Sequence, residues 1–136
     1  MLSHVKAHMK SILAAALCLA LASCATSSIA PPAKKGTVDH VVLMWQKRPG
    51  NTADRAKLAA ACNELRALDG IQFLDHGTAL PSERPVVDDS FDLGMVVRFD
   101  SAKSLHAYET DPRHVKKVNE VLKPLTKRIQ VYDITR

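Results

Sequence analysis

The segment "FDLGMVVRFDSAKSLHAYETDPRHVKKVNEVLKPL" (residues 91–125) decides the fold, because it contains a strand, two helices and the turns between them. Apolar side chains recur at every second position of residues 91–99, which predicts a strand with one buried face. That face would carry Phe91, Leu93, Met95, Val97 and Phe99.

The two helices are marked by their caps. Asp100 or Ser101 can cap a helix over residues 102–109, and Asp111 can cap a second helix over residues 112–125. Pro112 would then occupy the first helical position, where a missing N–H costs nothing. We expect the second helix to bury Val115, Val118, Val121 and Leu122.

The flanking segments complete one domain. Residues 38–46, "VDHVVLMWQ", are apolar at nearly every position and predict a strand covered on both faces. Residues 52–68 predict a helix, with Asn51 or Thr52 as cap and Gly70 as stop. Residues 71–80 and 128–134 predict two more strands, and residues 81–90 a loop. Helical spacing in residues 52–68 predicts four buried side chains: Leu58, Cys62, Leu65 and Leu68.

This order, β-α-β-β-α-β, predicts an α+β fold of the ferredoxin-like type: a four-stranded antiparallel sheet with helices on one face. The first strand is apolar on both faces, and Met44, Met95 and Val97 add apolar positions that one layer of helices would not all cover. A second copy packed on the open face is the simplest cover, which predicts a homodimer. A cleft filled by a ligand is the alternative.

The N-terminus predicts export to the cell envelope. Residues 1–23 carry Lys6 and Lys10, no acid and a short apolar run, as secretory signals do. Their end, Leu21-Ala22-Ser23 before Cys24, resembles the lipobox of bacterial lipoproteins, in which the cysteine is lipidated; an ordinary signal peptide is the alternative. Ala25 in place of Asp indicates the outer membrane, facing the periplasm. Residues 24–36 would form a flexible tether and residues 37–136 the domain.

Charge and cysteine content limit the partners. The full chain has a net charge of +5, and removal of Lys6 and Lys10 with the signal leaves +3. The basic residues are scattered and no stripe alternates with aromatic residues, so we expect no nucleic-acid partner. Cys62 would be the single thiol of the domain, which predicts a small buried side chain and no disulfide within the domain.

Two residues on either side of the Asp-Pro break are candidates for acid–base chemistry. Tyr108 and His114 are six residues apart, so a continuous helix would place them about 600° apart in rotation, on different faces. A bend at Asp111 could direct both at one cavity. Histidine is the natural base near neutral pH, and a tyrosine hydroxyl can hold a developing enolate oxygen.

The domain resembles the stress-responsive dimeric α/β-barrel (Dabb) family. The similarity lies in "DHVVLMWQKRPG" (39–50), in residues 91–125 and in "VYDI" (131–134), and covers nearly all of the domain. It implies homodimers whose sheets close into a barrel, with a pocket between each sheet and its helices. It implies no single activity, because the family includes plant stress proteins and a branch that cyclises polyketides.

The cyclase branch suggests roles for particular residues. A Tyr and a His that match Tyr108 and His114 do acid–base work there, and a His that matches His40 lies near the same pocket. This chain departs from that pattern in two places. Leu93 replaces a further pocket histidine and can neither donate nor accept a proton, whereas Asp111 replaces a histidine but still suits a helix cap.

Structural roles are the alternative for each candidate. His114 can serve as a hydrogen-bonding residue of the helix junction, Tyr108 as a packing side chain and His40 as a core histidine with a buried partner. His76 and His106 are expected at the surface. His40, His106 and His114 lack the close spacing of metal ligands, so we expect neither a metal nor a cofactor.

Two classes of function remain open. The first is a lipid-anchored homodimer that binds a small apolar or aromatic ligand in a pocket lined by His40, Tyr108 and His114. The second is an enzyme of the polyketide-cyclase or monooxygenase type, with His114 as base and Tyr108 as donor. An envelope location favours binding, and whether the protein is an enzyme stays open.

Overall fold

The computed structural model describes residues 30 and 32–136 and confirms the predicted ferredoxin-like order. The sheet consists of β1 (Val38–Gln46), β2 (Ile71–Gly77), β3 (Leu93–Phe99) and β4 (Thr126–Thr135). All neighbouring strands are antiparallel, in the order β2-β3-β1-β4. The signal peptide and the lipidated Cys24 predicted above lie outside the described residues. Within the described part of the chain, no helix is long and apolar enough to cross a membrane.

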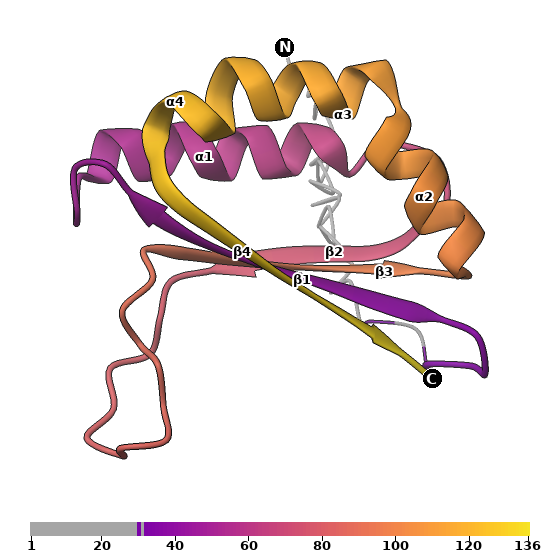
Figure 1. Cartoon of the computed structure of the whole chain (residues 1–136), viewed down its shortest axis with the longest axis horizontal. Coiled ribbons are helices and arrows are strands. Elements are labelled where there is room, and N and C mark those ends of the chain that lie inside the picture. The colour runs from indigo at the N-terminus through magenta and orange to yellow at the C-terminus, as the bar shows by residue number, and fades with distance from the viewer. Residues whose placement is uncertain (1–29, 31) are drawn as a thin grey trace, which may run out of the picture.

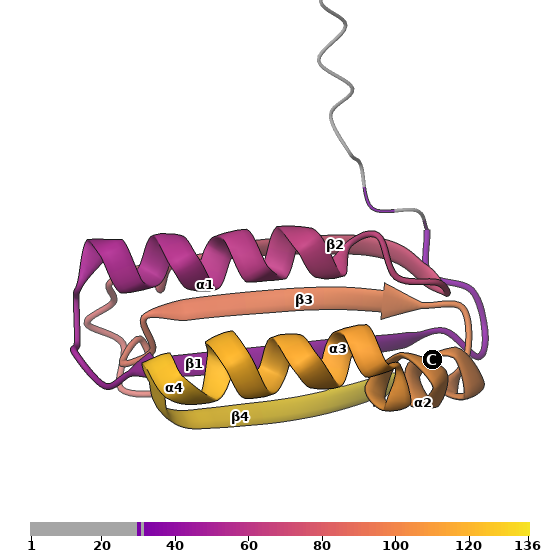
Figure 2. The ribbon, with the colours of Figure 1, turned by 90° about the horizontal axis from the view of Figure 1, so that it is seen from above.

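The helices all lie on one face of the sheet (Figure 1). Helix α1 (Thr52–Leu65) runs above β2, along one side of β3 (Figure 2). On the other side of β3, α3 (Pro112–Lys117) continues through the π-helical turn η1 (Val118–Leu122) into α4 (Lys123–Leu125), above β1 and β4. Helix α2 (Ala102–Thr110) closes one end of this layer. The loop between β2 and β3 extends away from the helices, beyond the other face of the sheet.

Local capping explains where the helices begin and end. The Asn51 side chain accepts a hydrogen bond from the Asp54 backbone N–H at 2.9 Å, and Ser101 caps α2 in the same way. Asp111 caps α3, and its extended backbone separates α2 from α3. Gly70 has a φ of 81°, a conformation that favours glycine, where the chain turns from α1 into β2.

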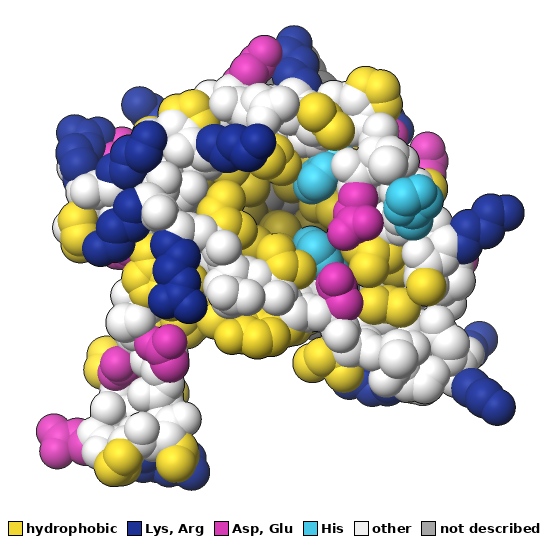
Figure 3. Space-filling view, in the orientation of Figure 1, with side chains coloured by type: hydrophobic (Ala, Val, Ile, Leu, Met, Phe, Trp, Pro, Cys, Tyr) yellow, Lys and Arg dark blue, Asp and Glu magenta, His cyan; other side chains and the backbone are white. Residues whose placement is uncertain are grey.

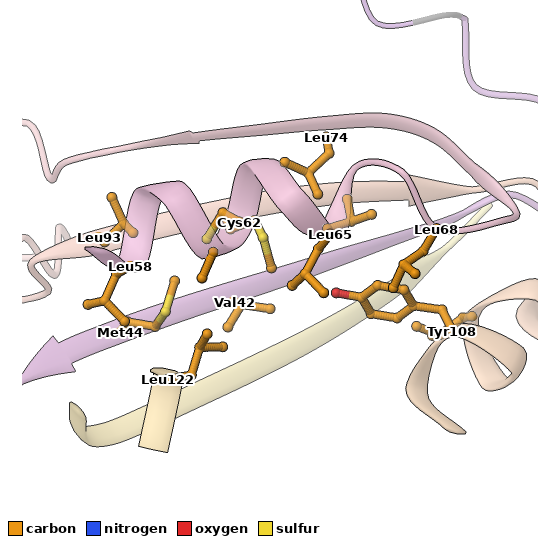
Figure 4. Close-up of a cluster of buried hydrophobic side chains, with 14 of the residues drawn as sticks. Val42, Met44, Leu58, Cys62, Leu65, Leu68, Leu74, Leu93, Tyr108 and Leu122 are labelled. Carbon is orange, nitrogen blue, oxygen red and sulfur yellow. The ribbon is translucent and has the colours of Figure 1, made fainter. Parts of the chain in front are cut away.

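The core fills the space between the sheet and the helices. The predicted buried face of α1 is confirmed, although α1 ends three residues before Leu68. Met44, Met95 and Val97 lie on the helix-facing side and are at most 2% exposed, so the prediction that the helices leave them uncovered is wrong. Figure 4 shows part of this core, with Met44 of β1 below Leu58 of α1.

The open face of the sheet carries a different apolar set. Val41 of β1 lies opposite Val96 of β3 on one side and Tyr132 of β4 on the other, so all three share this face. Val96, Tyr132 and Ile134 are 36%, 52% and 50% exposed. The alternation of β1 therefore places apolar side chains on both faces, as the sequence predicts.

Two side chains differ from the predicted pattern. Phe91 precedes β3 and packs edge-on against Trp45, over Gly94, so it does not share the helix-facing side with Leu93. Val115 is 43% exposed, because the first turn of α3 projects it toward solvent, so its predicted burial is wrong. Val118 and Val121 are half-buried against the core and Leu122 is buried.

Candidate functional site

A cavity of about 440 Å³ opens between the sheet and the helices. Its walls are mostly apolar and come from β1, β3, β4 and the helical layer, including both Val118 and Leu122 of the π-helical turn. Figure 3 shows the hollow from its open side, with a hydrophobic interior and with histidine and acidic side chains on one rim. His40, Tyr108 and His114, the three predicted site residues, all line it.

The bend at Asp111 brings Tyr108 and His114 together. Asp111 has an extended backbone (φ −62°, ψ 127°) and Pro112 begins the next helix, so the chain changes direction between them. The Tyr108 and His114 rings lie with centroids 4.2 Å apart at an angle of 42°. Arg113 holds the pKa of the Asp111 carboxyl down at about 2, so the cap is charged at any ordinary pH.

His114 is held in one tautomer. Its Nδ1 lies 3.2 Å from the backbone oxygen of Glu109. A carbonyl oxygen only accepts, so Nδ1 carries the proton and Nε2 is left as the acceptor nitrogen. Burial lowers the pKa of His114, and the nearby His40 acts in the same direction, while the Glu109 carbonyl opposes them. A neutral His114 with a free lone pair on Nε2 has the form of a general base.

Tyr108 contributes its ring rather than its hydroxyl. The residue is 2% exposed, and its hydroxyl has no hydrogen-bond partner among the described residues. In Figure 4 the hydroxyl end points toward Leu65 of α1, into the core. Burial raises the pKa of Tyr108 well above its ordinary value. Burial also raises the pKa of the neighbouring Cys62 thiol, to about 11. Cys62 is therefore a protonated core residue, as the sequence predicts.

The sequence predicts a buried partner for His40 without naming it; the partner is Asp133, whose side chain is 43% exposed. The Nδ1 of His40 lies 2.6 Å from a carboxylate oxygen of Asp133. The two residues are directly opposite in the β1–β4 register, on the helix-facing side. The carboxylate accepts, so His40 donates from Nδ1 and leaves Nε2 toward other groups. His40 is 6% exposed, and its ring meets those of Tyr108 and Phe99 edge-on at 6.0 and 6.3 Å.

Glu109 is the second residue that the sequence did not single out. One ligand atom from each of His40, Glu109 and Asp133 lies within 4.8 Å of the others, at the rim of the cavity. Asp133 lies in the alternating pattern of a strand, and Glu109 lies beside a tyrosine in a helix. No feature of the sequence therefore marked either one as a site residue. Only the distance across the sheet brings them to His40.

The remaining candidates lie elsewhere. His106 is exposed on α2, with Nδ1 4.0 Å from Glu109, and His76 reaches Asn63 on the side of α1. Leu93 is buried at 2% exposure and does not line this cavity. Among the described residues, two histidines therefore line the cavity, and Leu93 belongs to the core.

Solved structures share this fold. A Dabb family protein with a ferredoxin-like fold from Mesorhizobium loti is 20% identical, with a TM-score of 0.62 over 75% of this chain and 98% of that one. A dimeric ferredoxin-like protein of unknown function from Thermobifida fusca is 14% identical, with a TM-score of 0.61 over 76% and 93%. Hydroxynitrile lyase from Passiflora edulis is 17% identical, with a TM-score of 0.65 over 76% and 95%. At these identities the similarity shows the fold alone.

Those structures consist almost wholly of this domain, so the fold forms without further parts. Every helix and strand described here likewise lies between Val38 and Thr135. We refer to residues 32–136 below as the isolated domain.

None of the curated proteins matches the chain. The family model for the Stress responsive A/B Barrel Domain matches residues 38–136. The chain therefore belongs to the Dabb family of stress-responsive A/B barrel domains.

Proposed function

We propose that the protein is a lipid-anchored homodimer that binds a small, mostly apolar or aromatic ligand in the cavity between its sheet and its helices. The cavity itself carries this proposal. Its volume of about 440 Å³ lies within the range of small-molecule sites, roughly 300–1,000 Å³. Apolar walls with a few polar groups gathered on one rim are also typical of such sites.

The rim limits the charge of the ligand. Glu109 and Asp133 are its carboxylates, and the described residues that line the cavity include no Lys or Arg. In the absence of a bound cation, these carboxylates would repel an anionic ligand. A neutral phenol suits the site better, because Nε2 of His40 and of His114 is left to accept a hydrogen bond from its hydroxyl and the apolar walls can hold its ring.

The open face of the sheet supports a homodimer. Val96, Tyr132 and Ile134 are apolar side chains, each more than a third exposed, on one continuous face. Exposed apolar patches of this kind mark interaction surfaces. The Thermobifida fusca relative is described as dimeric, and a second copy of this chain offers a matching apolar face.

The anchor is proposed from the sequence of the N-terminus. Cys24 follows Leu-Ala-Ser, and lipidation there would attach the domain to the outer membrane through a tether of residues 24–36. More than one acyl chain makes such an anchor stable. Cells that express the full chain should incorporate labelled palmitate, and Cys24→Ala should abolish the label. Label that persists in Cys24→Ala would contradict this part of the proposal.

Ligand binding is tested with the isolated domain and a panel of neutral phenols and quinones. We expect NMR shift changes concentrated at the cavity. Val131→Phe adds bulk at a residue that lines the cavity and should weaken binding. Val115→Phe makes the same change at an exposed site outside the cavity and should not. No shift change with any compound, or equal effects of both variants, would contradict the proposal.

Catalysis by His114 is the second candidate, favoured by its fixed tautomer. Nδ1 donates to the Glu109 carbonyl, so Nε2 is available to take a proton from a bound substrate. A catalyst occurs on this fold, since the Passiflora edulis relative is a hydroxynitrile lyase. A Tyr108 donor is less favoured, because its hydroxyl is buried away from solvent. Compounds that bind would be followed by NMR over time: unchanged compounds support binding, and conversion lost in His114→Gln supports catalysis.

A further inference from the structure

Three side chains from distant parts of the chain meet at the rim of the cavity. His40 lies on β1, Asp133 lies opposite it on β4, and Glu109 comes from the last turn of α2. One nitrogen or oxygen of each lies within 4.8 Å of the others. Their positions in the sequence, 40, 109 and 133, have no ligand spacing, so only the fold reveals the group.

The two carboxylates, 43% and 44% exposed, have no Lys or Arg partner within the described part of the chain, unlike the buried acids of the domain. Asp54 pairs with Arg48, and Asp39 with Arg98 and Arg136. Within the described part of the chain, Asp133 meets only His40, and Glu109 meets only the exposed His106 at 4.0 Å. Two negative groups thus face one imidazole without an ammonium or guanidinium, which favours a cation between them.

The imidazole supplies a second, independent observation. His40 is 6% exposed, so the core holds it in place with Nδ1 directed at Asp133. An ion bound there would displace the Nδ1 proton to Nε2, which has no partner among the described residues. A neutral imidazole with two carboxylates is a donor set that suits Zn²⁺ or Mn²⁺.

The distances also suit one ion. Zinc ligands lie about 2.0–2.2 Å from the metal, so tetrahedral ligand atoms are separated by about 3.5 Å. The His40 and Asp133 atoms, now 2.6 Å apart, would separate by about 1 Å to admit the ion, and the Glu109 side chain can move toward it because it is 44% exposed.

We propose that His40, Glu109 and Asp133 bind one divalent transition-metal ion at the mouth of the cavity. Three protein ligands leave a position open toward the cavity, as in sites where a metal holds a water or an oxygen of a ligand. The ion would thereby fix the polar end of a molecule bound in the cavity. The site does not depend on the identity of that molecule.

The test is a calorimetric titration of the isolated domain with ZnCl₂, without any organic ligand. We expect one ion per chain. Glu109→Gln and Asp133→Asn each remove a ligand charge at nearly constant size and should lower affinity at least about tenfold. His106→Gln and Glu120→Gln change exposed groups outside the three ligands and should leave affinity unchanged. Circular dichroism checks that each variant is folded.

A second measurement needs no variant. Mn²⁺ broadens NMR signals of nearby nuclei, so the His40 ring signals should broaden first and those of His76, on the α1 side, last. Three results would overturn the proposal: no binding of Zn²⁺ up to millimolar concentration, loss of binding in His106→Gln but not in Asp133→Asn, or broadening at His106 without His40. The second and third would place the ion on the surface pair of His106 and Glu109. None of the three results bears on binding of the proposed organic ligand, which the Val131→Phe and Val115→Phe variants test separately.

Discussion

The ring of His114 lies 4.2 Å from the ring of Tyr108, centroid to centroid, although the two residues belong to different helices. The Asp111 backbone between them is extended, and this single non-helical residue turns α3 back toward the cavity. Both rings thereby line the cavity, together with the polar side chains of His40 on β1, Glu109 on α2 and Asp133 on β4.

The pKa of His114 should be lower than the ordinary value of about 6.5, because burial penalises its charged form. The unfolded chain then binds a proton more readily, so stability falls as pH falls from about 6.5 through the lower pKa of the folded state. NMR titration of the isolated domain checks this. A ligand that fills the cavity should lower the pKa further, whereas a normal value that no ligand changes would assign His114 to the helix junction alone.

Tyr108→Phe should leave stability unchanged or raise it by up to about 1 kcal/mol. The hydroxyl is buried without a hydrogen-bond partner in the described structure, so its removal relieves a desolvation cost. Urea unfolding measures the effect. A loss of more than about 1 kcal/mol would mean that the hydroxyl has a partner, and would favour a polar role for it.

Gly70→Ala should destabilise the domain more than Gly50→Ala. Both glycines have a positive φ, 81° and 71°, so alanine strains the backbone at either site by about 1 kcal/mol. At Gly70 the new Cβ would also lie 2.9 Å from the Cβ of Ser104, whereas nothing lies within 4 Å at Gly50. We expect about 2–3 kcal/mol for Gly70→Ala by urea unfolding. Equal losses would mean that α2 moves to accept the methyl group.

Asp39→Asn should cost about 3 kcal/mol, because the carboxylate is buried between two guanidinium groups. Asp39 bonds Arg98 at 2.6 Å and also pairs with Arg136. Arg98 holds the pKa of Asp39 below its usual range, so this contribution is present above about pH 4 and is lost as pH falls through the folded pKa. Urea unfolding at pH 7 and at pH 3 measures both effects. Asp75→Asn, at an exposed position, is the control and should be nearly neutral.

Val96→Lys should convert the proposed homodimer to a monomer. Val96 lies on the open face of the sheet, and a lysine there would be desolvated without a partner in the interface. Val115→Lys changes a similarly exposed valine on the helical side and should leave the dimer intact. Sedimentation velocity of the isolated domain separates the two. A wild-type domain that is monomeric at high micromolar concentration would refute the homodimer.

Several features of the fold could be read from short segments. The alternation of residues 93–99 identified β3 and its buried face, and Asn51, Ser101 and Asp111 were among the predicted caps. The same pattern failed for Phe91, because it lies beyond the end of the strand, where alternation no longer sets the direction of a side chain. Val115 failed because an apolar residue in the first turn of a helix need not face the core.

The site was only partly predictable. His40, Tyr108 and His114 were found through their residue types, the break at Asp111 and the family resemblance. Asp133 was not, because the residue that it bonds is 93 positions away in the sequence. Glu109 was not predicted either, because its role depends on its distance from His40 and Asp133, which the fold sets. The buried direction of the Tyr108 hydroxyl also depends on how α2 packs against β1 and β3.

By itself, then, the sequence determined the order of the strands and helices and the sites of their caps, since periodicity and capping are local properties of the chain. It also determined that the first strand is apolar on both faces. The tertiary structure decided which apolar residues the helices cover and which remain on the open face. It also decided that His40 meets Asp133 and Glu109, because strand register and helix packing set distances between residues that the order of the sequence leaves free.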